Sequence, residues 1–341
     1  MGKVTAADIA KACGVSQATV SYVLNDRPDK SISSATREKI LAAARELNYY
    51  PNVNARSMRM SKAMSIGVVV GQDSMSLSFN KALKGIKQAL YQNGYSITLL
   101  PDDEPSDRAQ YISYYLSRRI DGLLFLYTTL DLAAEELLGK YGLPHLVINE
   151  AGISGCGIRL HTGLRAVIQQ CVHYCRQHGF VRNAYFSFGA TTQNPAVTRK
   201  IELLREYFQQ DYPCAGLTEE VFARGMEEEA LFEAIDAALE RLQPQLVFTP
   251  LPRLSMATEG RILRRCFQLP QTVKLISLYD SRYFDALYPS VTHLEFPLGE
   301  MGVYACECLL AALHGREPPI RSFSCSLKAG MSTLDEGGRN L

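Results

Sequence analysis

The fold of this chain is constrained most strongly by the segment 5–25, in which two short apolar helix faces flank a single glycine. The first face consists of Ile9, Ala10 and Cys13, and the second consists of Val20, Val23 and Leu24. Gly14 can adopt the left-handed backbone of a tight turn, and Ser16 can cap the second helix. Two short helices joined through such a turn predict a helix-turn-helix unit.

The outward positions of the second predicted helix carry no charge. They are Gln17, Ala18, Ser21, Tyr22 and Asn25. Amide and hydroxyl groups can pair with base edges in the major groove of DNA, and a small apolar group fits against the thymine methyl. The composition of this face therefore suits a helix that lies in a major groove.

A third predicted helix closes the unit. Ser33 can cap it, and Tyr49 or Tyr50 can seal its small core before Pro51 ends the helix. Residues 1–62 contain ten Lys/Arg and five Asp/Glu, a net charge of +5, whereas the whole chain carries +1 and the remainder −4. A basic N-terminal unit on a mildly acidic body is typical of nucleic-acid binding. The alternative is a three-helix bundle that only packs against another segment.

Short motifs in this N-terminal region form a set. They are Asp8-Ile9-Ala10, Gly14-Val15-Ser16, Thr19-Val20-Ser21, Leu24-Asn25, Thr36-Arg37-Glu38-Lys39-Ile40, Leu47-Asn48-Tyr49, Pro51-Asn52 and Ala55-Arg56. The set resembles the headpiece of the lac repressor/galactose repressor family of bacterial transcription regulators. The resemblance has almost no gaps over residues 3–60 and continues more loosely to about residue 330.

The resemblance implies a sequence-specific DNA-binding regulator, by default a repressor. Ser16, Thr19, Ser21 and Asn25 match positions that mostly hold phosphates or orient the helix. Gln17, Ala18 and Tyr22 fall where the family reads bases, and Tyr22 replaces an arginine of many members. The other implied DNA contacts are Thr5, Ser33, Thr36, Asn52, Ala55 and Arg56.

Residues 52–60 resemble the hinge helix of the family. Such helices fold on DNA, pair across the dimer and insert an apolar side chain into the minor groove. Met58 stands where leucine is usual, and it is long enough to wedge a base step open. The alternative is an ordinary linker helix.

The body alternates apolar strand patterns with amphipathic helix patterns. Strands are expected near 66–70, 96–100, 122–127, 145–149, 183–188, 245–249 and 273–278, and helices near 82–93, 112–116, 163–178, 196–210, 227–242, 254–268 and 299–314. This alternation predicts two α/β lobes, each a doubly wound parallel sheet. Together with the family resemblance, this pattern implies an all-α helix-turn-helix headpiece followed by a body of the periplasmic-binding-protein type.

The resemblance also implies where the parts begin and end. A headpiece would span 1–50, a hinge 51–63 and the effector-binding and dimerisation domain 64–341. The chain would cross between lobes near 160–163, 290–294 and 318–322, so that the first lobe holds about 64–160 and 294–319 and the second about 161–293 and 320–333. The helix over 299–314 would return to the first lobe.

Several classes of protein are disfavoured by the sequence. No apolar run reaches about eighteen residues, and the polar, basic N-terminus is unlike a signal sequence. A cytoplasmic location on the bacterial nucleoid is expected. The nine cysteines are scattered and predict reduced thiols rather than disulfides or a metal site. We find no catalytic motif and expect no enzyme activity, metal or cofactor.

The resemblance implies a homodimer on double-stranded, pseudo-palindromic operator DNA, with a carbohydrate-related small-molecule effector in a cleft between the lobes. The candidate effector-lining residues are Gln72, Asp73, Phe79, Tyr127, Asn149, His161, Arg199, Arg253, Tyr279 and Asp280. Several family positions that bind sugar hydroxyls hold apolar, aromatic or basic residues here. Either Arg199, Arg253 and His161 bind an anionic group such as a phosphate, or the pocket has lost its ligand or taken an apolar or protein partner.

The remaining alternative is a ligand-binding module of the periplasmic-receptor type with no role on DNA. An exported receptor would carry a signal peptide in place of residues 1–60. The N-terminal region therefore argues against this alternative.

Overall fold

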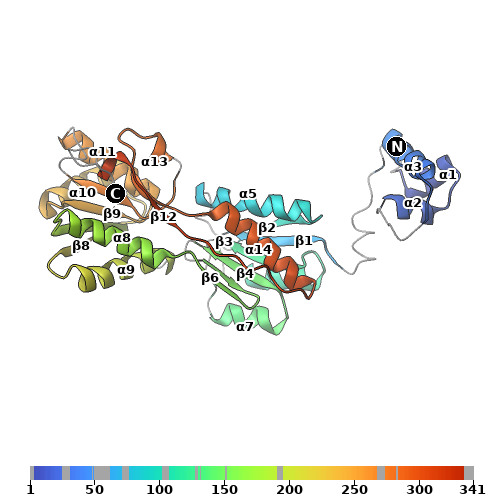
Figure 1. Ribbon diagram of the computed structural model, residues 1–341, viewed down its shortest axis with the longest axis horizontal. Coiled ribbons are helices and arrows are strands. Elements are labelled where there is room, and N and C mark those ends of the chain that lie inside the picture. Colours follow the sequence, from blue (N-terminus) through green and yellow to red (C-terminus); the bar gives the residue numbers. More distant parts are fainter. Residues whose placement is uncertain are drawn as a thin grey trace. The chain divides into compact units, whose positions relative to one another are not determined.

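The computed structural model describes residues 4–24, 31–47, 49, 62–70, 77–101, 107–126, 130, 132–149, 152–189, 195–266, 273–281 and 283–333. The chain forms two compact units, Met1–Ala63 and Met64–Leu341. Figure 1 shows the helices and strands of both units as a ribbon.

The first unit contains the three predicted helices, α1 (Ala6–Cys13), α2 (Gln17–Leu24) and α3 (Ser34–Glu46). Gly14 ends α1 with a φ of 66°, which confirms the predicted left-handed turn. Ile9, Val20 and Ile40, one from each helix, are 0% exposed and form the centre of a small core. Tyr49 packs against this core, as the sequence predicts, whereas Tyr50 lies outside the described residues.

The first lobe of the second unit has a six-stranded sheet in the order β2-β1-β3-β4-β5-β6. Its parallel strands are β1 (Ser65–Val70), β2 (Ser96–Pro101), β3 (Gly122–Leu126) and β4 (His145–Asn149), followed by the antiparallel β5 (Gly152–Gly155) and β6 (Ile158–His161). Helices α5 (Leu77–Gln92) and α14 (Leu298–Leu313) cover one face, where Ile66 and Val68 are buried. Helices α6 (Asp107–Leu116) and α7 (Leu132–Lys140) cover the other, against Val69 and Phe125.

Two glycines let α5 and α14 approach closely, side by side in Figure 1. A Cβ atom on Gly85 would overlap the carbonyl oxygen of Gly299, and one on Gly302 would overlap the carbonyl oxygen of Ala82. The C-terminal part of the chain thus completes a lobe that the N-terminal part begins.

The second lobe has a six-stranded sheet in the order β12-β11-β10-β9-β7-β8. The strands are β7 (Arg182–Phe188), β8 (Gly216–Phe222), β9 (Leu246–Thr249), β10 (Lys274–Ser277), β11 (Thr292–Glu295) and the antiparallel β12 (Ser326–Lys328). Helices α8 (Leu164–Gln177) and α9 (Pro195–Asp211) pack on one face, and α10 (Glu228–Leu242), α11 (Pro252–Cys266) and α13 (Tyr283–Ala286) on the other; the short η3 (Met331–Thr333) follows β12. This architecture confirms the predicted fold class, with antiparallel strands added to each parallel sheet.

The second crossing between the lobes differs from the sequence-based expectation of 290–294. Strand β11 continues in the second sheet to Glu295, and α14 begins on the first lobe at Leu298. The crossing therefore falls at 296–297. The strand extends to Glu295 because its last two residues, Leu294 and Glu295, pair with β12.

Candidate nucleic-acid interface and effector residues

The N-terminus of α2 is held by a pair of hydroxyl side chains. The backbone N–H of Thr19 donates to Ser16 Oγ at 3.1 Å, and the two hydroxyl oxygens lie 2.8 Å apart. The same arrangement begins α3, where the Thr36 N–H donates to Ser33 Oγ at 3.2 Å and the hydroxyl oxygens lie 2.8 Å apart. Both predicted N-caps are confirmed. Each hydroxyl pair satisfies part of a helix terminus whose remaining N–H groups can meet a phosphate.

The start of α1 is fixed by Thr5 and Asp8. Asp8 Oδ2 accepts hydrogen bonds from the Thr5 hydroxyl at 2.7 Å and from the Thr5 backbone N–H at 2.8 Å. Both hydrogen bonds lower the pKa of the Asp8 carboxyl, and the bond from the Thr5 hydroxyl has the larger effect. The Thr5 hydroxyl therefore orders the helix start, and its predicted contact with DNA stays a prediction.

A reciprocal pair of contacts joins α1 to α3, and sequence reasoning missed it. Lys39 Nζ donates to the Cys13 carbonyl at 3.0 Å, and Cys13 Sγ donates to the Lys39 carbonyl at 3.7 Å. A cation at the C-terminus of α1 also interacts favourably with the helix dipole. These contacts help to set the angle at which α3 holds the helix-turn-helix.

The outward side of α2 is accessible and uncharged. Gln17 and Ala18 are exposed, while Thr19, Ser21 and Tyr22 are half-buried. Asn25 and the predicted hinge contacts Asn52, Ala55, Arg56 and Met58 lie outside the described residues. The described part of the first unit thus presents a capped helix whose polar side chains can reach a groove.

Two of the predicted effector residues lie in one cluster at the junction of the lobes. Asp280 is 1% exposed and accepts from Lys81 Nζ at 2.7 Å and from the Phe296 backbone N–H at 3.0 Å. Beside it, Tyr279 and Phe296 flank the buried Lys200, whose Nζ lies 5.3 Å and 5.8 Å from the two ring centroids. Sequence reasoning missed Lys81 and Lys200.

The other described effector candidates have separate partners. Arg199 pairs with Glu202 at 3.0 Å, and Arg253 donates to the Met226 carbonyl at 2.9 Å. Asn149 Oδ1 accepts from the Gly152 N–H at 3.2 Å, which closes a turn, and His161 is exposed at the end of β6. Within the described part of the chain, no hydrogen bond links Arg199, Arg253 and His161 to a common partner. Gln72, Asp73, Tyr127 and the side chain of Phe79 lie outside the description.

Three family models match the chain in series. Residues 5–52 match the model of bacterial regulatory proteins of the lacI family, residues 63–154 match the periplasmic binding proteins and sugar-binding domain of the LacI family, and residues 172–333 match a periplasmic binding protein-like domain. The chain belongs to the lacI family. It is therefore a DNA-binding transcription regulator and not an enzyme.

Relatives of this lacI-family regulator span nearly its whole length. The ribose operon repressor of Escherichia coli (strain K12) is 26% identical over 315 residues, which cover 90% of this chain and 92% of that protein. The transcriptional repressor PurR of Vibrio vulnificus (strain CMCP6) is 24% identical over 323 residues, which cover 94% and 95%. The crystal structure of the lac repressor dimer bound to operator and the anti-inducer ONPF has a TM-score of 0.80 at 19% identity, covering 98% of this chain and all of that one, and it shows the shared fold.

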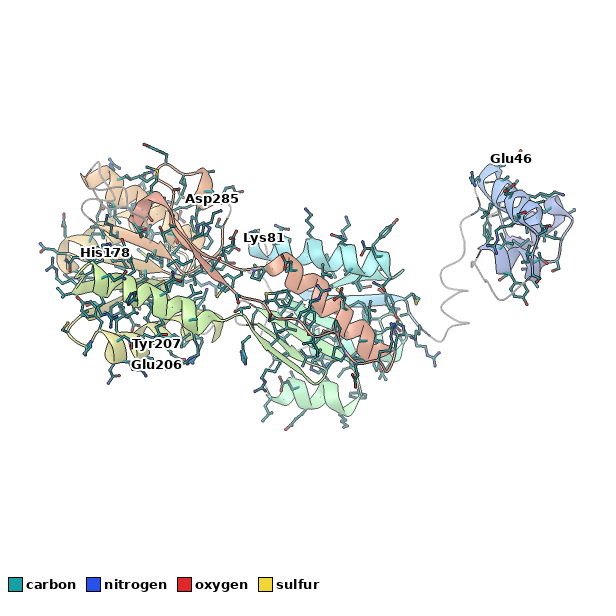
Figure 2. The ribbon with its side chains drawn as sticks, in the orientation of Figure 1. Glu46, Lys81, His178, Glu206, Tyr207 and Asp285 are labelled. Carbon is teal, nitrogen blue, oxygen red and sulfur yellow. The ribbon has the colours of Figure 1, made fainter. Side chains whose placement is uncertain are left out.

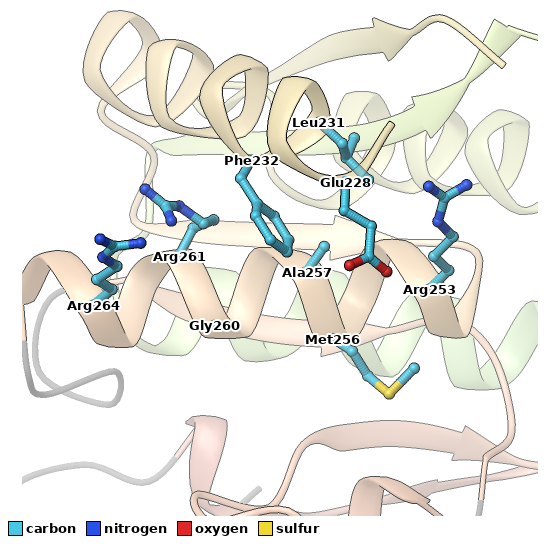
Figure 3. Close-up of a pocket in the computed structure, with 9 residues that line it drawn as sticks. All are labelled: Glu228, Leu231, Phe232, Arg253, Met256, Ala257, Gly260, Arg261 and Arg264. Atoms are coloured by element: carbon cyan, nitrogen blue, oxygen red, sulfur yellow. The ribbon is translucent and has the colours of Figure 1, made fainter. Parts of the chain in front are cut away.

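The second lobe of the lacI-family chain also has a cavity of about 410 Å³ between α10 and α11 (Figure 3). It is lined by Glu228, Leu231, Phe232, Arg253, Met256, Ala257, Gly260, Arg261 and Arg264. The Arg261 guanidinium pairs with the Asp236 carboxylate and lies 5.5 Å from the Phe232 ring centroid. Sequence reasoning did not predict this cavity. Its residues come from two helices, and no local sequence pattern shows how these helices pack against each other.

No helix among the described residues is both long enough and apolar enough to cross a membrane. No group of three or more His, Cys, Asp or Glu side chains there is arranged to bind a metal ion. The described cysteines are all free thiols, and burial raises the pKa of Cys171 to about 12.

Proposed function

We propose that this protein is a sequence-specific repressor that binds a pseudo-palindromic operator as a homodimer and responds to a small-molecule effector. The observation that carries the proposal is the capped, uncharged α2 on a basic N-terminal unit, within the segment that matches the lacI-family model. Repression is supported by the relatives, which are named as repressors of a ribose operon and of the PurR type. A protein that acts on bacterial DNA works in the cytoplasm, and association with the nucleoid is part of the proposal.

The proposed division of labour follows the two units. A headpiece over 1–50 reads the operator, a hinge over 51–63 inserts Met58 at its centre, and the domain over 64–341 dimerises and binds the effector. Gln17, Ala18 and Tyr22 contact bases. The residues that hold phosphates or orient the helix are Ser16, Thr19, Ser21 and Asn25. Two-fold symmetry of the dimer would be mirrored in two half-sites of the operator.

The proposed effector is a sugar, a sugar phosphate or a related metabolite. One solved relative is the regulator CelR in complex with cellobiose, with a TM-score of 0.61 and 20% identity. In this chain, the cations Lys81 and Lys200 lie near the predicted effector residues Tyr279 and Asp280.

The proposed function is tested by selection from a randomised duplex pool with purified full-length protein. The expected result is enrichment of a motif with two inverted half-sites, and a Gln17→Ala/Tyr22→Ala double variant should lose the motif while it still binds DNA non-specifically. Ribose, cellobiose, a purine base and sugar phosphates should each be tried as co-ligands. Absence of any enriched motif under all of these conditions would refute sequence-specific repression.

Tyr22→Ala should relax the preference at one base pair in each half-site. The expected loss is about 1–3 kcal/mol of discrimination, the value of one good base contact. Tyr22→Phe is the matched control, because it keeps the ring and removes the hydroxyl. A sequence logo that is unchanged by Tyr22→Ala would show that Tyr22 does not read a base.

A further inference from the structure

Among the described residues, an ion pair between Lys81 and Asp280 ties the first lobe to the second. Lys81 lies in α5, at the end of that helix that faces the second lobe (Figure 2). Its Nζ lies 2.7 Å from Asp280 Oδ1, and Asp280 follows β10 in the second lobe. The two residues are 199 positions apart in the chain. Because they belong to different lobes, the contact exists only while the lobes are held together.

The carboxylate of Asp280 is engaged on both oxygens. Oδ1 accepts from Lys81, while Oδ2 accepts from the Phe296 backbone N–H at 3.0 Å. Phe296 lies in the crossing between β11 and α14, which is one of the segments that must bend if the lobes move. One buried side chain therefore joins a helix of the first lobe, a strand end of the second lobe and the crossing between them.

The two partners of the ion pair differ in exposure. Asp280 is 1% exposed, whereas Lys81 is 38% exposed. The rings of Tyr279 and Phe296 lie around the neighbouring Lys200, which is itself 1% exposed. The carboxylate end of the pair is therefore shielded from water, whereas the ammonium end of Lys81 remains partly in contact with it.

We propose that Lys81 and Asp280 form an interlobe latch that sets the closure of the lobes with no small molecule bound, and that Lys81 is thereby a positioning residue for operator affinity. In a regulator whose operator affinity depends on how far the lobes close, a ligand acts only through the difference between its affinities for the open and the closed state. The latch contributes to the free-energy difference between these two states through side chains of the protein itself. The link to operator affinity rests on the proposed function, whereas the latch itself does not.

The first test measures lobe closure by small-angle X-ray scattering of the full-length protein. Lys81→Met and Asp280→Asn should each increase the radius of gyration, and the double variant should increase it no further, since each change breaks the same bond. Asp280→Asn keeps an acceptor for the Phe296 N–H, so it isolates the ion pair. Lys81→Arg should restore the wild-type value, and Lys84→Met, on the same helix at an exposed position, should not change it.

The second test measures affinity for the selected operator. Lys81→Met should change the dissociation constant by at least about fivefold, the lower end of typical coupling between sites, and Lys81→Arg should return it towards wild type. Equal scattering curves for wild type, Lys81→Met and Asp280→Asn would overturn the latch. Altered scattering with unchanged operator affinity would overturn the positioning role, and failure to select any operator would count against the proposed function while the scattering result still decides the latch.

Discussion

Ile40→Ala is expected to abolish operator binding while the second unit stays folded. Ile40 is 0% exposed and meets Ile9 and Val20 at the centre of the only core that the described first unit has. Removing a buried isoleucine side chain to alanine costs about 2–5 kcal/mol. A domain this small rarely has more than about 3–5 kcal/mol of stability from its core, so most of the headpiece should unfold.

The measurement combines operator binding with thermal unfolding of the full-length protein. Binding to the selected operator should weaken by at least about a hundredfold, which corresponds to roughly 2.7 kcal/mol. The melting transition of Met64–Leu341 should be unchanged, because that unit has its own core. Glu46→Ala is the control, since Glu46 is exposed at the end of α3 (Figure 2). Wild-type binding by Ile40→Ala would show that the three-helix core does not present α2.

Gly85→Ala is expected to destabilise the second unit by about 3 kcal/mol or more, the upper range for overpacking. The added Cβ would overlap the backbone carbonyl of Gly299 in α14, and a backbone atom cannot move aside as the end of a flexible side chain can. The whole contact between α5 and α14 must then widen, which also disturbs the packing of Ile66 and Val68 beneath it.

Urea unfolding of the full-length protein measures this effect. Gly260→Ala is the matched control, because it makes the same change inside α11 at a site where the new Cβ meets nothing within 4 Å. There alanine should stabilise the helix by about 0.5–1 kcal/mol. Equal stability of the two variants would contradict the close approach of α5 and α14.

The local sequence was enough to predict strands that consist of an unbroken run of apolar residues. Strands β1 and β3 lie inside their sheet and are buried on both faces, so they read as apolar runs. The caps of α2 and α3 were also predictable, since each depends on a hydroxyl residue only three positions before its partner.

Elements at sheet edges were missed because their pattern depends on neighbours that are distant in sequence. Strand β8 pairs only with β7, and it carries Glu219 and Glu220, which form ion pairs with Arg205 and Arg241. By sequence, these acidic residues look like ordinary surface charge. Strands β5, β6, β11 and β12 have only three or four residues each, and none of them contains three consecutive apolar residues as the equally short β9 does.

In the candidate site, too, features of a single helix could be predicted from the sequence, whereas contacts between distant residues could not. The exposed face of α2 is a property of one helix and was predicted from its spacing. The contacts of Lys39 with Cys13 and of Lys81 with Asp280 join residues 26 and 199 positions apart, and no local pattern reports them. An anionic subsite of Arg199, Arg253 and His161 was one of two alternatives that residue type alone suggested, and these side chains have separate surroundings in the structure.

The return of α14 to the first lobe affects the order in which the chain matures on the ribosome. Residues 6–46 hold every helix of the headpiece core, so this unit can fold as soon as it leaves the exit tunnel. The sheet face that bears Ile66 and Val68 has no complete cover until residue 313 has been made. A nascent chain halted between these points would carry a folded DNA-binding unit on a body whose apolar surface is still open.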